Sequence, residues 1–141
     1  MQRKTETKVI DHPVLGPVSY KITAMDAKQG RTIFVHLMKV MGPMVKAKTD
    51  LSTALTQLDT NDVDILCDAF AKSTTISYTD PTAGGAESKG VQLSIVFGEH
   101  FSAAYKTMFM WLSACAELNY GDFLGEARKQ SAQGLGSQTA Q

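Results

Sequence analysis

The sequence predicts a single α+β domain, mainly helical, with a small antiparallel β-hairpin or sheet. Two patterns support this fold class: alternating apolar residues near the N-terminus, and several later segments with apolar residues at helical spacing. The chain has 141 residues, 43% hydrophobic and 20% charged, which is enough for one core. We expect the domain to span residues 1–130 and a disordered tail to follow at 131–141.

The first expected element is a β-hairpin within residues 5–25. A turn-forming segment rich in proline and glycine occupies residues 12–17. After it, Val18, Tyr20 and Ile22 alternate with polar residues, which is the pattern of a half-buried strand.

A long helix is expected next, over about residues 26–46, with Asp26 as its N-cap. Gly42 and Pro43 lie inside this segment. Because proline lacks a backbone N–H and restricts the residue before it, we expect a kink or break there.

The middle of the chain is expected to contain short helices and strands. The expected positions are helices at 50–58 and 61–72, strands at 74–79 and 91–96, and a mobile polar loop at 80–90. Asn61 is the expected cap of the second helix. Asp62, Asp64 and Asp68 are expected to form a solvated face of that helix.

The longest helix is expected over residues 99–117, followed by a turn at 119–124. Apolar residues surround more than half of this helix, so it is either central to the core or also meets a partner. The residues expected in the core are Cys67, Phe70, Phe101, Tyr105, Phe109 and Leu112.

Composition argues against a nucleic-acid or membrane-bound function. Fourteen basic residues balance fourteen acidic ones, whereas a nucleic-acid binder normally carries a basic excess. No apolar run has the length that a membrane span needs, and we expect no signal peptide after Met1. A cytoplasmic location is therefore expected.

Motifs for catalysis or cofactor binding are also missing from the sequence. His12, His36 and His100 lack metal-ligand spacing, and no phosphate-binding loop is present. Cys67 and Cys115 lie within apolar helical patterns and are expected in the core rather than as nucleophiles. We therefore expect no enzyme activity, no catalytic, cofactor-binding or metal-binding residues, and no cofactor.

Methionine and tryptophan supply the candidate binding surface. The first long helix carries Met41 and Met44, and the last one carries Met110 and Trp111 outside its main apolar stripe. Flexible, polarizable methionine suits surfaces that bind apolar partners. These four residues are the candidate partner-binding residues, and the alternative is that they fill the core.

Two segments resemble the tail assembly chaperones of long-tailed bacteriophages. Residues 119–123, Asn-Tyr-Gly-Asp-Phe, follow the long apolar helix as a similar ending does in that family. Residues 27–31 lead into an apolar helix that ends in Val40-Met41-Gly42-Pro43, like the family's helix with a Gly-Pro near its end. The resemblance covers roughly residues 24–126.

The resemblance implies a late protein of virion morphogenesis that works in the host cytoplasm and is absent from the mature virion. It implies that the chain binds the tape measure protein and helps recruit tail tube subunits. Self-association is left open. The alternatives are a small structural tail or neck subunit of the virion and, from the cysteines, a thiol-dependent enzyme.

Overall fold

In a computed structural model, the chain forms one α+β domain with an antiparallel sheet, as expected. The structure describes the backbone of residues 3–47, 51–79 and 90–139, and the side chains of residues 3–39, 53–79 and 90–122. The elements in chain order are β1 (Thr5–His12), β2 (Gly16–Thr23), α1 (Ala27–Ala47), α2 (Leu51–Leu55), α3 (Thr60–Lys72), β3 (Thr74–Tyr78), β4 (Val91–Gln92), α4 (Leu93–His100) and α5 (Tyr105–Thr139).

The sheet has the strand order β1-β2-β3-β4, with every neighbouring pair antiparallel. The predicted hairpin is confirmed, and Gly16 supplies the positive φ of 74° at the start of β2. On β2, Val18, Tyr20 and Ile22 are buried while Lys21 is exposed. One face of the sheet therefore carries the helices, and the other is open.

Helix α1 confirms the first long helix and its cap. The backbone N–H of Gln29 donates to Oδ1 of Asp26 at 2.9 Å. Of the kink or break predicted at Gly42-Pro43, the break is wrong, because α1 is one helix from Ala27 to Ala47. A proline removes one hydrogen bond of the helix, and the other turns keep theirs.

Helix α3 begins at Thr60, close to the predicted start, but its cap differs. Oδ1 of Asp59 accepts from the backbone N–H of Asp62 at 2.8 Å, so Asp59 rather than Asn61 is the N-cap. Asp62 is also only 1% exposed. The predicted solvated face of three acids is therefore wrong for Asp62 and right for its two neighbours, which are exposed.

The strand predicted at 91–96 ends after Gln92 and gives way to α4. Leu93 and His100 are buried seven residues apart, which is two turns of a helix. The helix predicted at 99–117 correspondingly begins later, at Tyr105. Between the two helices, Ala103 has a φ of 54°, a left-handed conformation that neither helix can contain.

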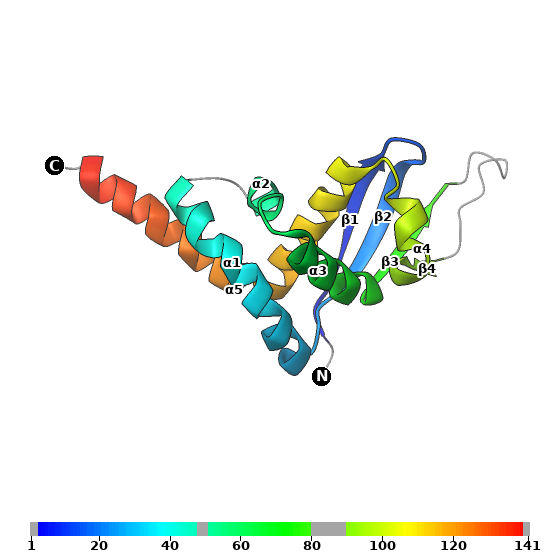
Figure 1. Cartoon of the computed structure of the whole chain (residues 1–141), viewed down its shortest axis with the longest axis horizontal. Coiled ribbons are helices and arrows are strands. Elements are labelled where there is room, and N and C mark those ends of the chain that lie inside the picture. Colours follow the sequence, from blue (N-terminus) through cyan, green and yellow to red (C-terminus); the bar gives the residue numbers. More distant parts are fainter. Residues whose placement is uncertain (1–2, 48–50, 80–89, 140–141) are drawn as a thin grey trace.

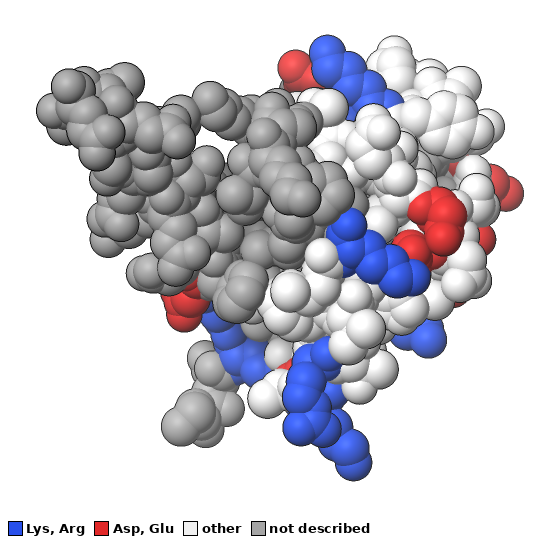
Figure 2. Space-filling view, turned by 60° about the vertical axis from the view of Figure 1, so that its left-hand side comes forward, with Lys and Arg blue, Asp and Glu red and all other residues white. Residues whose placement is uncertain are grey.

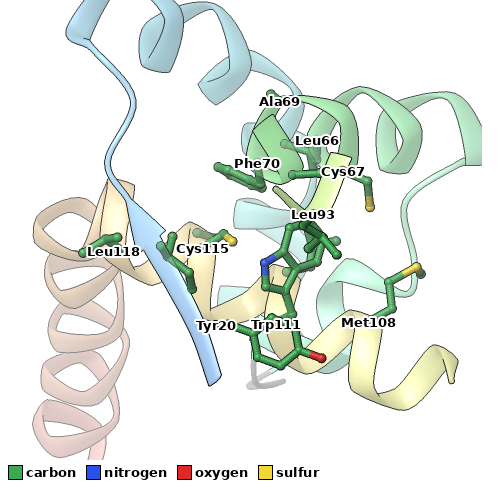
Figure 3. Close-up of a cluster of buried hydrophobic side chains, with 14 of the residues drawn as sticks. Tyr20, Leu66, Cys67, Ala69, Phe70, Leu93, Met108, Trp111, Cys115 and Leu118 are labelled. Carbon is green, nitrogen blue, oxygen red and sulfur yellow. The ribbon is translucent and has the colours of Figure 1, made fainter. Parts of the chain in front are cut away.

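The core lies between the sheet and α3, α4 and α5, and Figure 3 shows Trp111 at its centre beside Tyr20 and Leu93. Of the predicted core residues, those confirmed as buried are Cys67, Phe70, Phe101 and Leu112. Phe109 is half-buried against the core. Tyr105 is 65% exposed, so its prediction is wrong; it is the first residue of α5.

The last part of the chain also differs from expectation. In place of the turn predicted at 119–124, α5 has a kink at Tyr120, whose φ is −127°, and then continues to Thr139. Residues 131–139 thus belong to α5, and the predicted end of the domain at residue 130 stays a prediction. In Figure 1 this part of α5 runs beside α1, away from the sheet. The predicted loop at 80–90 lies outside the described residues, except for Gly90.

Candidate partner-binding surface

The kink of α5 is a joint that ties this helix to α1. Oδ1 of Asn119 accepts from the backbone N–H of Met25 at 2.8 Å, and its Nδ2 donates to the Cys115 carbonyl at 2.9 Å. The Tyr120 hydroxyl donates to the Gly30 carbonyl at 2.7 Å. The segment that begins at Asn119 therefore sets the angle between the two helices.

A groove of about 360 Å³ opens beside this joint. Its apolar wall includes Phe34 and Tyr120, whose ring centroids lie 5.0 Å apart. Asp26, Arg31 and Asp122 also line it. An apolar wall with charges of both signs beside it suits an amphipathic segment better than a purely apolar ligand.

An exposed apolar stripe continues from the groove along α1. Met38 lies four residues after Phe34 and therefore on the same side of the helix. Met38 is 44% exposed and its neighbour Val35 is 61% exposed. Monomeric helices usually turn such residues inward, so this stripe is the part of α1 that a partner would cover.

The predicted site residues fall into three groups. Met110 is 43% exposed on α5 and available to a partner. Trp111 is 0% exposed, and its Nε1 donates to Oγ1 of Thr74 at 3.2 Å, so the domain itself covers it. Trp111 is therefore a core residue and is not part of the candidate surface. Met41 and Met44 lie in α1, but their side chains are outside the described residues.

Met110 and the α1 stripe form separate surfaces. Met110 precedes the kink at Tyr120 by ten residues, which is roughly 15 Å along a helix. The stripe of Val35 and Met38 lies on α1, which meets α5 at that kink. The prediction grouped methionines from both helices, and the structure assigns them to two places.

Both cysteines are unsuited to nucleophilic chemistry. Burial, helped by the charges of Asp64 and Asp68, raises the pKa of Cys67 to about 12. Burial also raises the pKa of Cys115 well above its ordinary value. Both are free thiols and stay protonated near neutral pH, where a thiol reacts slowly.

A buried carboxylate, which the sequence did not predict, joins α1 to α3. Both oxygens of Asp62 accept from Nζ of Lys39 at 2.9 Å, and Oδ1 lies 2.7 Å from Nδ1 of His36. The hydrogen bond from Lys39, then that from His36, lowers the pKa of Asp62. The helical spacing of His36 and Lys39 was visible in the sequence, but their partner on another helix was not.

A second missed cluster is the buried pair of His12 and His100. Nδ1 of His12 accepts from the backbone N–H groups of Val14 and Leu15, so its Nε2 donates to the His100 carbonyl, at 2.6 Å. Nε2 of His100 is hydrogen-bonded to the Tyr20 hydroxyl at 2.8 Å. This cluster closes the hairpin turn against the end of α4 and is satisfied internally.

Two kinds of functional feature are absent from the described part of the chain. No group of three or more histidine, cysteine, aspartate or glutamate side chains there has the arrangement of a metal site. None of its helices is both long and apolar enough to cross a bilayer. On the face shown in Figure 2, basic and acidic side chains occur together, with wide uncharged areas between them.

Comparison with known proteins places the chain in a family. A family model described as phage tail assembly chaperone protein, TAC, matches residues 16–136, far more than half of the 141 residues. The matched region contains both α1 and the joint at Tyr120. No curated protein and no solved structure gives a significant match. The chain belongs to the phage tail assembly chaperone family.

Proposed function

We propose that this chain binds the tape measure protein of its phage and helps recruit tail tube subunits during tail morphogenesis. The observation that carries the proposal is the family match over residues 16–136. The role needs no catalysis, in keeping with the protonated, buried thiols of Cys67 and Cys115.

The α1 stripe of Val35 and Met38, with the adjoining groove, is the proposed binding surface for the tape measure protein. Both side chains are exposed on the same helix, next to a groove that has apolar walls. Fully burying such a side chain stabilises a complex by about 1.5–3 kcal/mol. A long apolar helix laid along α1 would thus lose the surface through which it aggregates.

The groove's charged residues would set the direction of the bound helix. Arg31 offers one positive charge, and Asp26 and Asp122 offer negative ones. Opposite charges on the bound helix would fix its register, while its apolar face would supply most of the affinity. Met41 and Met44, farther along α1, are proposed as the continuation of this surface.

Co-expression with the tape measure protein tests the proposal. The wild-type chain should keep the tape measure protein soluble and be recovered with it in a pull-down. The double variant Val35→Asp/Met38→Asp should lose at least tenfold in affinity, because two charges would then be buried in the interface. Ile95→Asp is the matched control, since Ile95 is 74% exposed on α4 and away from the groove.

Three outcomes decide the matter. Loss of binding in the double variant alone supports the surface. Equal binding by wild type and double variant, with unchanged far-UV circular dichroism, refutes the α1 surface. Failure of the wild-type chain to bind refutes the proposed function itself.

We further propose that the chain acts in the host cytoplasm and leaves the tail before the virion is complete. Mass spectrometry of purified virions separates this role from that of a structural tail or neck subunit. A chaperone should be present in infected-cell extracts and missing from particles. Stoichiometric amounts in the particle would favour the structural subunit.

A further inference from the structure

We propose that two copies of this chain associate by pairing their β1 strands, antiparallel and centred on Thr7, so that two four-stranded sheets become one. The proposal concerns an edge of the sheet that the proposed tape measure surface does not use. The proposal rests on three observations: the backbone groups of β1 that point outward, the charged side chains of β1, and the side of α5 next to this strand.

The hydrogen bonds between β1 and β2 show which backbone groups of β1 point away from β2 and have no partner among the described strands. The backbone N–H of Ala24 donates to the Lys4 carbonyl at 2.8 Å, next to the facing pair Thr5 and Thr23. Because bonded and non-bonded pairs alternate along an antiparallel ladder, the outward backbone groups belong to every second residue. On β1 these residues are Thr5, Thr7, Val9 and Asp11.

Among the described residues, the β1 edge is open from Thr5 to Val9, whose outward residues are all exposed. β1 is the first strand in the sheet order, so no strand of the described part of the chain lies beyond it. Asp11, near the end of β1, has an outward carbonyl that accepts a hydrogen bond from the Thr107 hydroxyl at 3.2 Å. The edge from Thr5 to Val9 carries no proline, and its β-branched residues favour strand pairing.

The charges on β1 select a second copy as the partner. In an antiparallel pair with its two-fold axis at Thr7, Glu6 of each copy faces Lys8 of the other copy. Beyond the paired segment, Arg3 comes opposite Asp11. The same strand pairs with itself so that each of these charges meets its opposite.

Neighbouring registers are disfavoured by the same charges. An axis at Glu6 or at Lys8 would keep the outward hydrogen bonds but place two like charges directly opposite each other. Within one chain, Nζ of Lys8 already lies 3.1 Å from Oε1 of Glu6, with both side chains about half exposed. Pairing at Thr7 would extend this ion pair into an alternating group of four charges.

Helix α5 adds an apolar flank to the edge. The helix lies along β1, since Thr107 contacts Asp11 at one end and Asn119 contacts Met25 near the other. Met110 follows Thr107 by three residues and projects about 60° away from it, beyond the buried arc of the helix. A second copy at the β1 edge would cover Met110. The formal net charge of zero does not oppose such association.

Light scattering coupled to size exclusion tests the proposal. The wild-type chain should elute with twice the 15.3 kDa monomer mass at high concentration and dissociate on dilution. Thr7→Pro should be monomeric, because it removes an outward N–H that the fold does not use. Glu6→Lys should weaken the dimer at least tenfold, because the new lysine of each copy would lie opposite Lys8 of the other.

The charge exchange gives the decisive comparison. The double variant Glu6→Lys/Lys8→Glu should restore the dimer, since the opposite charges again face each other. Lys21→Glu, on the open face of β2, is the control and should dimerise like wild type. If Thr7→Pro fails to fold, the charge variants still decide. A monomeric wild type, or a Glu6→Lys chain that dimerises like wild type, overturns the proposal.

Discussion

Mild acid should destabilise this protein through the buried ring of His100. Burial, and to a lesser degree the neighbouring His12, lowers the pKa of His100 from 6.5 to about 4. The ring lies 4.8 Å from that of His12 and is hydrogen-bonded to the Tyr20 hydroxyl. The perturbation is a change of pH from about 7.5 to about 5, across the gap between the unfolded and folded pKa values.

The direction and size of this change in unfolding free energy follow from the difference between the folded and unfolded pKa values of His100. Because the folded pKa is the lower one, the unfolded chain binds the proton more readily. The stabilisation is complete above the unfolded pKa of 6.5 and is lost as the pH falls towards about 4. At about pH 5 the two values give a loss of about 2 kcal/mol. For a chain of this size that loss lowers the melting temperature by about 6–10 °C.

Urea unfolding at a series of pH values measures this effect. The control is His100→Gln, whose free energy of unfolding should vary less between the same two pH values. Histidine ring resonances followed by NMR report the pKa directly. A midpoint for His100 near 6.5, or an equal pH dependence in wild type and variant, would refute the argument from burial.

Three further predictions concern the core and the joints between elements. Trp111→Ala should cost about 3–5 kcal/mol of unfolding free energy in urea titrations, as expected for a core anchor; a loss of less than about 1 kcal/mol would contradict its central position. Tyr120→Phe should cost about 0.5–1.5 kcal/mol by removing the bond to the Gly30 carbonyl, and an unchanged urea midpoint would show that the bond contributes nothing. Asp62→Asn should lower the melting temperature at neutral pH and reduce the stability lost on acidification, because the pKa of Asp62 is lowered in the fold and its stabilisation is lost as the pH falls through that value; a variant with the wild-type acid profile would contradict this.

The sequence correctly predicted those elements in which the spacing of apolar residues fits either a strand or a helix, but not both. The alternation of Val18, Tyr20 and Ile22 identified β2, and the apolar spacing within residues 26–46 identified α1. Residues 91–97 fit two periods at once, because their apolar residues alternate and also recur at helical spacing. The sequence alone could not choose, and burial of Leu93 and His100 on one side decided for a helix.

The candidate site was predictable only in part. Met110 is exposed as the pattern allowed, but Trp111, the next residue, is buried, because it lies within the buried arc of α5 and Met110 lies beyond that arc. Local patterns also do not show pairings between distant residues. His12 and His100 are 88 residues apart in the sequence and meet only in the fold.

Prevention of tape measure aggregation is the most direct test of the central claim. Purified tape measure protein would be diluted from denaturant, alone or with an equimolar amount of this chain, while light scattering is recorded. The account predicts strong suppression by the wild-type chain and by Ile95→Asp, and little suppression by Val35→Asp/Met38→Asp, since Val35 and Met38 form the exposed stripe beside the groove. Aggregation that proceeds equally with and without the wild-type chain would contradict the account.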